Sequence, residues 1–229
     1  MTKIREAIAI FSANIILFSL IILTVRVPAN ILFELINFNL PSAADEFAQY
    51  TREIRIHNLL GTIFDPIYIG AIIHCLWQLK QGRSVKYSQV ILVGIQNWGK
   101  IFTARFITTF YILLGLIAFI IPGIVLALRY TLIDSIVIIE GYGNSSSLLK
   151  RSTHLTTGKR WEISGVVSLF TVATTIITLI VYILGYLIIR EYNIFLNIIV
   201  SSFLDVIVAT YTVIMFLFYW QARNEEQNH

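Results

Sequence analysis

Long apolar runs, nearly free of charged residues, recur along the chain. Most of them reach the roughly 20 residues that a helix needs to cross a hydrocarbon core about 30 Å thick. The pattern therefore predicts about six transmembrane helices, over residues 7–25, 59–79, 101–121, 124–139, 163–189 and 192–220.

The fourth run, over residues 124–139, is shorter than the others. At 1.5 Å per residue a helix of this length spans only about 24 Å. Two interpretations are open: a tilted helix packed inside the bundle, or a re-entrant segment. The last two runs are separated only by Arg190 and Glu191, which predicts a tight helical hairpin.

Three of the connecting segments have helical periodicity. Ala43, Phe47, Tyr50 and Ile54 fall on one face of a helix, and segments 84–97 and 144–161 also place apolar residues on one face. We expect short amphipathic helices at the membrane surface, joining the spans as elbows. The predicted fold is an all-α polytopic bundle forming one transmembrane domain over residues 1–229.

The composition agrees with a membrane environment. Hydrophobic residues make up 57% of the chain and charged residues 13%, whereas a soluble domain has about 25% charged residues. The net charge of +4 does not indicate nucleic-acid binding, because the basic residues gather at the ends of the apolar runs. That placement is typical of the positive-inside rule.

The basic residues also predict an orientation. With the N-terminus in the cytoplasm, four basic residues fall outside (Arg26, Arg52, Arg55 and Arg190) and Arg105 and Arg129 fall within spans. Eleven then lie inside: Lys3, Arg5, Lys80, Arg83, Lys86, Lys100, Lys150, Arg151, Lys159, Arg160 and Arg223. The excess predicts that both termini are cytoplasmic.

Charged residues inside the apolar runs are candidates for a polar network, because an ionised group in a bilayer needs a partner. Counting at 1.5 Å per residue places Asp65 and Arg129 about 9 Å from the same surface, which predicts a contact between them. The same counting predicts a contact between Arg105 and Asp134. Asp205 lies near the middle of the last run without a matching cation. The network either holds helices together or forms a pathway for an ion or a headgroup.

The segment after residue 139 is a second candidate site. Basic residues and a tryptophan at a cytoplasmic surface are suited to anionic lipid headgroups, with about 1 kcal/mol from each basic residue. A plain connecting role is the alternative. Glu140 is expected to pair with Lys150, Arg151 or Lys159 and to fix the elbow. The candidate residues are Glu140, Lys150, Arg151, Lys159, Arg160 and Trp161.

Motifs for catalysis are missing from the sequence. It contains no glycine-rich phosphate loop, no His-Glu-x-x-His pair and no Gly-x-Ser-x-Gly elbow. The histidines have no metal-ligand spacing, and Cys75 is the only cysteine. We therefore expect no enzymatic activity, no cofactor and no bound metal.

Residues 114–161 read LGLIAFIIPGIVLALRYTLIDSIVIIEGYGNSSSLLKRSTHLTTGKRW. This segment resembles the membrane domain attached to some bacterial glycerophosphodiester phosphodiesterases, and related six-span bacterial proteins. Its anchors are Ile121-Pro122-Gly123, Arg129, Glu140, residues 149–152, Leu155, Gly158 and Trp161. The resemblance does not extend to the phosphodiesterase domain, a barrel of about 250 residues for which these spans leave no room.

These observations lead to one expected function and one alternative. We expect a non-enzymatic protein of the bacterial plasma membrane, or of a thylakoid-type membrane, with a structural, scaffolding or lipid-associated role. Its expected partners are anionic lipid headgroups, and a membrane protein or a second copy of the chain. The alternative is a small transporter or channel that uses the buried Asp and Arg residues. A transporter needs a water-accessible cavity at those residues, whereas a scaffold seals them between helices.

Overall fold

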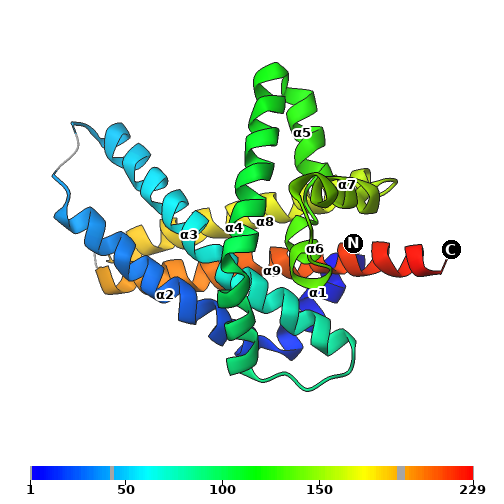
Figure 1. The fold of residues 1–229 in the computed structure, drawn as a ribbon. Helices are drawn as coiled ribbons and strands as arrows, with labels where there is room; N and C mark the ends of the chain where they lie inside the picture. Colours follow the sequence, from blue (N-terminus) through cyan, green and yellow to red (C-terminus); the bar gives the residue numbers. More distant parts are fainter. Residues whose placement is uncertain (1, 42–43, 190–193, 229) are drawn as a thin grey trace.

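The computed structural model describes residues 2–41, 44–189 and 194–228, which form helices and no strand (Figure 1). Six segments are long and apolar enough to cross a membrane: α2, α3, α4, α5 together with α6, α8 and α9. The chain is therefore an all-α membrane protein, as predicted. The helices are α1 (Thr2–Ala13), α2 (Ile15–Asn39), α3 (Glu46–Lys80), α4 (Tyr87–Ala118), α5 (Ile120–Arg129), α6 (Ile133–Ile139), α7 (Ser145–Thr156), α8 (Arg160–Ile189) and α9 (Ile194–Gln227).

The first span differs from the prediction of residues 7–25. A break at Asn14 separates α1 from α2, and the apolar spanning helix is α2, which continues to Asn39. The prediction ended at Val25 because Arg26 and Pro28 follow it. Both residues lie inside α2, and Arg26 is only 7% exposed. A buried arginine was therefore mistaken for the end of the span.

Two of the three predicted elbow helices are not separate. Residues 46–54 belong to the long helix α3, whose first turn is capped by the Asp45 carboxylate accepting from the Ala48 amide at 2.7 Å. Likewise, residues 87–97 begin α4. Ala43, which was predicted to share the face of the first elbow, and the hairpin at residues 190 and 191 lie outside the described residues.

The third elbow is α7, and its start is well defined. The Asn144 side chain accepts from the Ser147 amide at 2.8 Å, and the Ser147 hydroxyl lies 3.4 Å from the Asn144 amide, which forms a capping box. The fourth apolar run is also interrupted, because α5 ends at Arg129 and α6 begins at Ile133. Two short helices therefore replace the single helix of the prediction.

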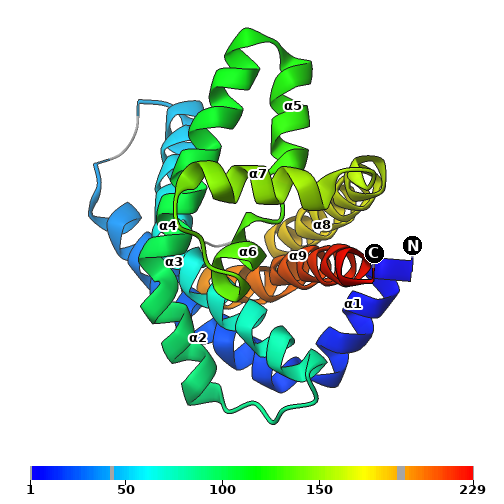
Figure 2. The ribbon, with the colours of Figure 1, turned by 45° about the vertical axis from the view of Figure 1, so that its right-hand side comes forward.

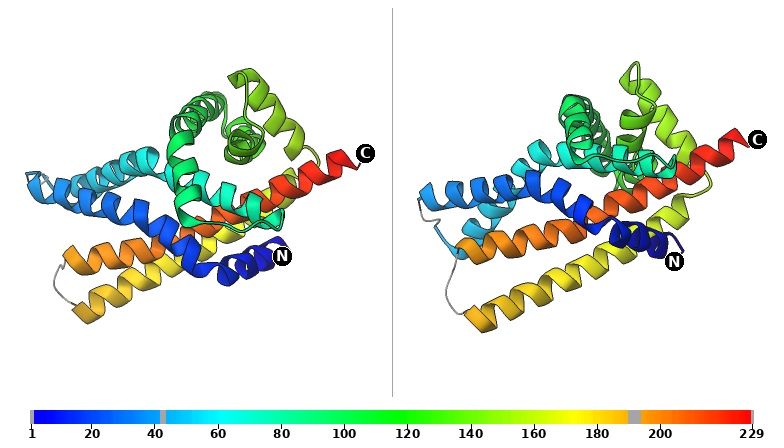
Figure 3. Two further views of the ribbon diagram at one scale, coloured as in Figure 1. Left: turned by 60° about the horizontal axis from the view of Figure 1, so that its bottom comes forward. Right: turned by 90° about the horizontal axis from the view of Figure 1, so that it is seen from below.

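The helices form two arms that meet at the centre of the molecule. In Figure 1, the end of α2, the start of α3, the end of α8 and the start of α9 lie at the left, and α9 continues to the C-terminus at the right, while the hairpin of α4 and α5 rises upward. Figure 2 shows α7 lying across the ends of α5 and α6, and Figure 3 shows α8 beside α9. The start of α1 and the end of α9 lie at the same end of the molecule. We call this the terminal end.

The core lies where these arms meet. Residues 212–219 of α9 are buried all round, including Phe216, Phe218 and Tyr219, and they share the apolar core with Ile72 and Leu76 of α3. By contrast, only 6% of the most apolar stretch of α8 is buried. A helix that is apolar and unburied requires a lipid environment along most of its length.

Candidate functional site

A row of buried polar residues follows one face of α2. Arg26, Asn30 and Glu34 are spaced four apart, so they lie above one another on the helix, and each is at least 93% buried. Polar groups withdrawn from water in this way are costly unless they are hydrogen-bonded. The row therefore requires partners on the neighbouring helices.

Arg26 joins α2 to two other helices. Its Nη1 donates to Asp65 Oδ1 of α3 at 3.0 Å, and its Nη2 donates to Asp205 Oδ1 of α9. Asn30 Nδ2 donates to Asp205 Oδ2 at 3.0 Å and to Ser202 Oγ at 3.1 Å. We call the set of Arg26, Asn30, Asp65, Ser202 and Asp205 the Arg26 network.

The network continues one turn further along the same two helices. Asn197 Nδ2 of α9 donates to Glu34 Oε1 of α2 at 2.7 Å. Hydrogen bonds from two successive turns of α2 and α9 therefore fix the register of these helices within the apolar region.

Two predictions about these residues were wrong. Asp65 was expected to contact Arg129, but it lies against Arg26, and Asp205 was expected to lack a cation. Arg129 instead ends α5, where its carbonyl oxygen accepts from the Ser152 hydroxyl of α7 at 2.7 Å. Both errors follow from placing the end of the first span at Val25, because this put Arg26 outside the membrane.

The predicted contact between Arg105 and Asp134 is present. Arg105 Nε donates to Asp134 Oδ1 at 3.0 Å, and Nη2 donates to Oδ2 at 2.6 Å. The two parallel hydrogen bonds join α4 to α6 in the bidentate geometry that only a guanidinium offers.

We expect Arg105→Lys to lower the free energy of unfolding although the charge is kept. A lysine makes a single point contact and loses one of the two hydrogen bonds, a loss of about 1–3 kcal/mol for a charged pair. Thermal unfolding of the purified protein in detergent measures the change. Arg55→Lys, at an exposed position of α3, is the control, and equal stability of the two variants would contradict the prediction.

The second candidate site lies around α7 at the terminal end. Arg151 donates to Glu140 Oε2 at 2.7 Å and to both carboxylate oxygens of Glu226 at 2.7 Å. These hydrogen bonds, first to Glu226 and then to Glu140, raise the pKa of the Arg151 guanidinium. Glu140 also accepts from the Tyr219 hydroxyl at 2.9 Å. The predicted partner of Glu140 is thus Arg151, and α7 is fixed to α6 and α9.

The remaining basic residues of this site divide into two groups. Lys159 lies 2.5 Å from Glu225, so its charge is paired. Lys150 is exposed and Arg160 is half-buried, and neither has a carboxylate within ion-pair distance in the part of the chain that the structure describes. Trp161 follows Arg160 and is 91% exposed. We call Lys150, Arg160 and Trp161 the basic edge.

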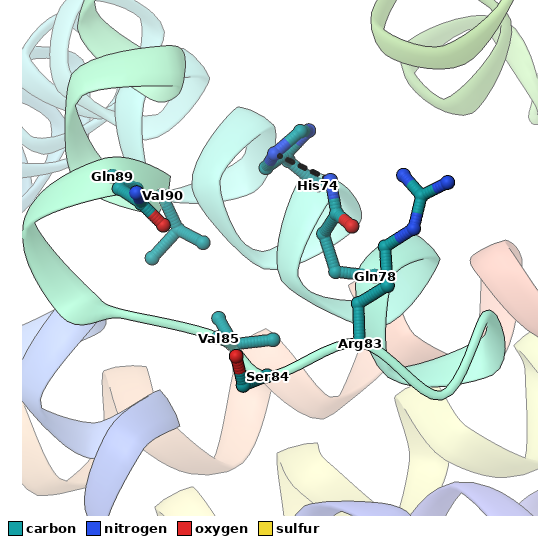
Figure 4. A pocket seen from close by; sticks show the side chains of 7 residues that line it. All are labelled: His74, Gln78, Arg83, Ser84, Val85, Gln89 and Val90. Atoms are coloured by element: carbon teal, nitrogen blue, oxygen red, sulfur yellow. Dashed lines mark hydrogen bonds between the residues drawn. The ribbon is translucent and has the colours of Figure 1, made fainter.

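A pocket of about 390 Å³ lies between the last turns of α3 and the first turn of α4 (Figure 4). The sequence did not indicate it, because residues 84–97 were predicted only as an amphipathic elbow helix. His74 and Gln78 lie on one side and are within hydrogen-bond distance at 3.3 Å, while Gln89 and Val90 lie across from them. Its lining residues are His74, Gln78, Arg83, Ser84, Val85, Gln89 and Val90.

Within residues 2–41, 44–189 and 194–228, no group of three or more His, Cys, Asp or Glu side chains is arranged to hold a metal ion. Fold and sites together define a polytopic helical membrane protein with an internal ionic network and a basic surface at one end. No family model, curated protein or solved structure matches the chain.

Proposed function

We propose that this chain is a non-enzymatic protein of a bacterial plasma membrane that associates with anionic lipid headgroups. The observation that carries the proposal is the basic edge. Among the described residues, acidic side chains pair with Arg151 and Lys159 but not with Lys150 or Arg160, and Trp161 is exposed. Tryptophan prefers the headgroup region, and each basic residue near an anionic surface contributes about 1 kcal/mol.

The orientation that we propose places the terminal end in the cytoplasm. With Arg26 now inside a span, the predicted outer side retains Arg52, Arg55 and Arg190, against eleven basic residues on the inner side. The bias is therefore stronger than the sequence first indicated. The anionic lipids of the cytoplasmic leaflet would then face the basic edge.

The alternative function, transport through the buried ionic residues, has less support. The Arg26 and Asp205 side chains are only 8% and 11% exposed, and each is held by hydrogen bonds from other helices. Groups sealed in this way are suited to holding α2, α3 and α9 together. This favours a structural role for the Arg26 network.

Lipid binding by native mass spectrometry tests the proposal. We expect the double variant Lys150→Ala/Arg160→Ala to bind phosphatidylglycerol about thirtyfold more weakly, since two basic contacts of about 1 kcal/mol each are lost. Binding of zwitterionic phosphatidylcholine should not change.

The control is Arg52→Ala/Arg55→Ala, which alters the net charge equally but near the start of α3, on the other side of the molecule from α7. If both double variants lost the same affinity, net charge alone would account for the binding and the proposed site would be wrong.

A further inference from the structure

The pocket between α3 and α4 has a chemical character that the proposed function does not use. Five of its seven lining side chains are polar, and each of the five can donate a hydrogen bond: His74, Gln78, Arg83, Ser84 and Gln89. None of the lining side chains is a carboxylate. The set is therefore suited to a ligand that accepts hydrogen bonds and carries negative charge.

The charge at the pocket comes from Arg83. Its side chain lies beside Gln78 in Figure 4, and the residue is exposed. Among the described residues no carboxylate lies within ion-pair distance of Arg83, whereas the nearby Lys80 is paired with Glu6 at 3.1 Å. Arg83 therefore gives the pocket a positive charge that no carboxylate among the described residues neutralises.

The start of α4 adds to this positive character. Lys86 precedes the helix and makes no side-chain hydrogen bond to the amides of its first turn. The partial positive charge of a helix N-terminus attracts anions. α4 is long, and its first turn supplies two of the lining residues.

The C-terminal end of α3 repels an anion in the pocket only weakly. Its last carbonyl groups, those of Trp77, Gln78 and Leu79, accept hydrogen bonds from the amides of Gln81, Gly82 and Arg83. Because these acceptors are already satisfied, they do not repel an anion as free carbonyl groups would. The balance at the pocket favours a negative ligand.

The size of the pocket narrows the class of ligand. Pockets that hold small molecules enclose roughly 300–1,000 Å³, so about 390 Å³ accommodates a phosphoryl group together with a few further atoms. Val85 and Val90 provide apolar contacts for those atoms. Arg83, with its forked donors, matches the oxygens of a phosphate group.

We infer that this pocket binds a phosphate group, either of a lipid headgroup or of a small soluble phosphate compound. Arg83 pairs with the phosphate oxygens, Ser84 and Gln89 donate hydrogen bonds, and the His74–Gln78 contact holds the Gln78 amide at the wall. The inference is independent of the basic edge, because the two sites share no residue.

Thermal unfolding of the full chain in detergent provides the test, with inorganic phosphate and short-chain phosphatidic acid as separate probes and sodium chloride at equal ionic strength as the reference. We expect the wild type to be stabilised by at least one probe. Arg83→Ala should lose most of this stabilisation, while Arg55→Ala should retain it. Lys150→Ala/Arg160→Ala should retain the stabilisation by inorganic phosphate, although it binds anionic lipid more weakly.

Each outcome bears on the inference. Stabilisation by both probes indicates a site for phosphate in general, and stabilisation by phosphatidic acid alone indicates a lipid headgroup. An equal response of wild type and Arg83→Ala, or no response of the wild type to either probe, would overturn it. If only the Lys150→Ala/Arg160→Ala variant lost the stabilisation by inorganic phosphate, the phosphate would bind at the basic edge instead.

Discussion

Replacing Arg26 by glutamine is expected to cause one of the largest losses of stability available to a single substitution in this chain. Arg26 is the guanidinium that Asp65 and Asp205 share, and its removal leaves two carboxylates facing one another without their cation. Breaking a buried ion pair by removing one partner costs about 3–5 kcal/mol. Thermal unfolding in detergent should show this as a large fall in the midpoint temperature.

A double-mutant cycle separates this effect from a general loss of packing. Asp205→Asn in the Arg26→Gln background removes one of the two stranded charges, so the second substitution should recover part of the stability that the first one lost. Asp205→Asn alone should destabilise, because Arg26 and Asn30 lose a charged acceptor.

Arg55→Gln is the matched control, since Arg55 is an exposed arginine of α3. If Arg26→Gln and Arg55→Gln unfolded at the same temperature, or if the two substitutions at Arg26 and Asp205 were simply additive, the Arg26 network would not have the stabilising role assigned to it.

The two predicted ionic contacts show which side-chain contacts can be predicted from the sequence of a helical membrane protein. Arg105 and Asp134 lie fourteen residues before and fifteen residues after Phe119, the residue that connects α4 to α5. Counting from a shared turn gives their relative depth directly. Asp65 and Arg129 have no such shared turn, so their depths depended on where each span was placed.

Arg26 was missed for a different reason. A hydropathy criterion treats a charged residue as the end of an apolar run, although a paired arginine can lie inside a span. The spacing of Arg26, Asn30 and Glu34 was a usable signal, because three polar residues at intervals of four indicate one buried face. Their partners on α9 could not be predicted, since they lie more than 160 residues away along the chain.

The elbow around Glu140 was predictable in part. Its pairing with a basic residue of the following segment is local, and Arg151 was among the three candidates. Glu226 and Tyr219, which complete the contact, come from the last helix. Which distant helix lies next to a site depends on how all the helices pack. The apolar periodicity of the sequence does not by itself specify that packing.

The close approach of α3 and α4 depends on a glycine on each helix. At Gly94 of α4, a Cβ atom would lie 2.2 Å from the Ile67 carbonyl oxygen and 3.1 Å from the Ala71 nitrogen, both in α3. The partner glycine on α3 is Gly70, whose own Cβ would lie 3.3 Å from the Gly94 Cα. Small residues of this kind allow membrane helices to pack backbone against backbone.

We therefore expect Gly94→Leu to separate α3 from α4 and to prevent stable folding. Even the first side-chain atom overlaps a backbone oxygen, which a rotamer change cannot relieve, so the cost should exceed the roughly 1–3 kcal/mol of ordinary overpacking. The separation would also open the pocket between these helices and displace Arg105 from Asp134. Size-exclusion profiles and thermal unfolding in detergent measure the loss.

Gly99→Leu serves as the comparison on the same helix, because a Cβ at Gly99 meets nothing within 4 Å. This variant should remain monodisperse and unfold near the wild-type temperature, and Gly94→Ala should fall between the two leucine variants. A Gly94→Leu protein as stable as Gly99→Leu would show that α3 and α4 do not cross at Gly94. The phosphate pocket would then need a different structural basis, because its two walls are the helices that this crossing brings together.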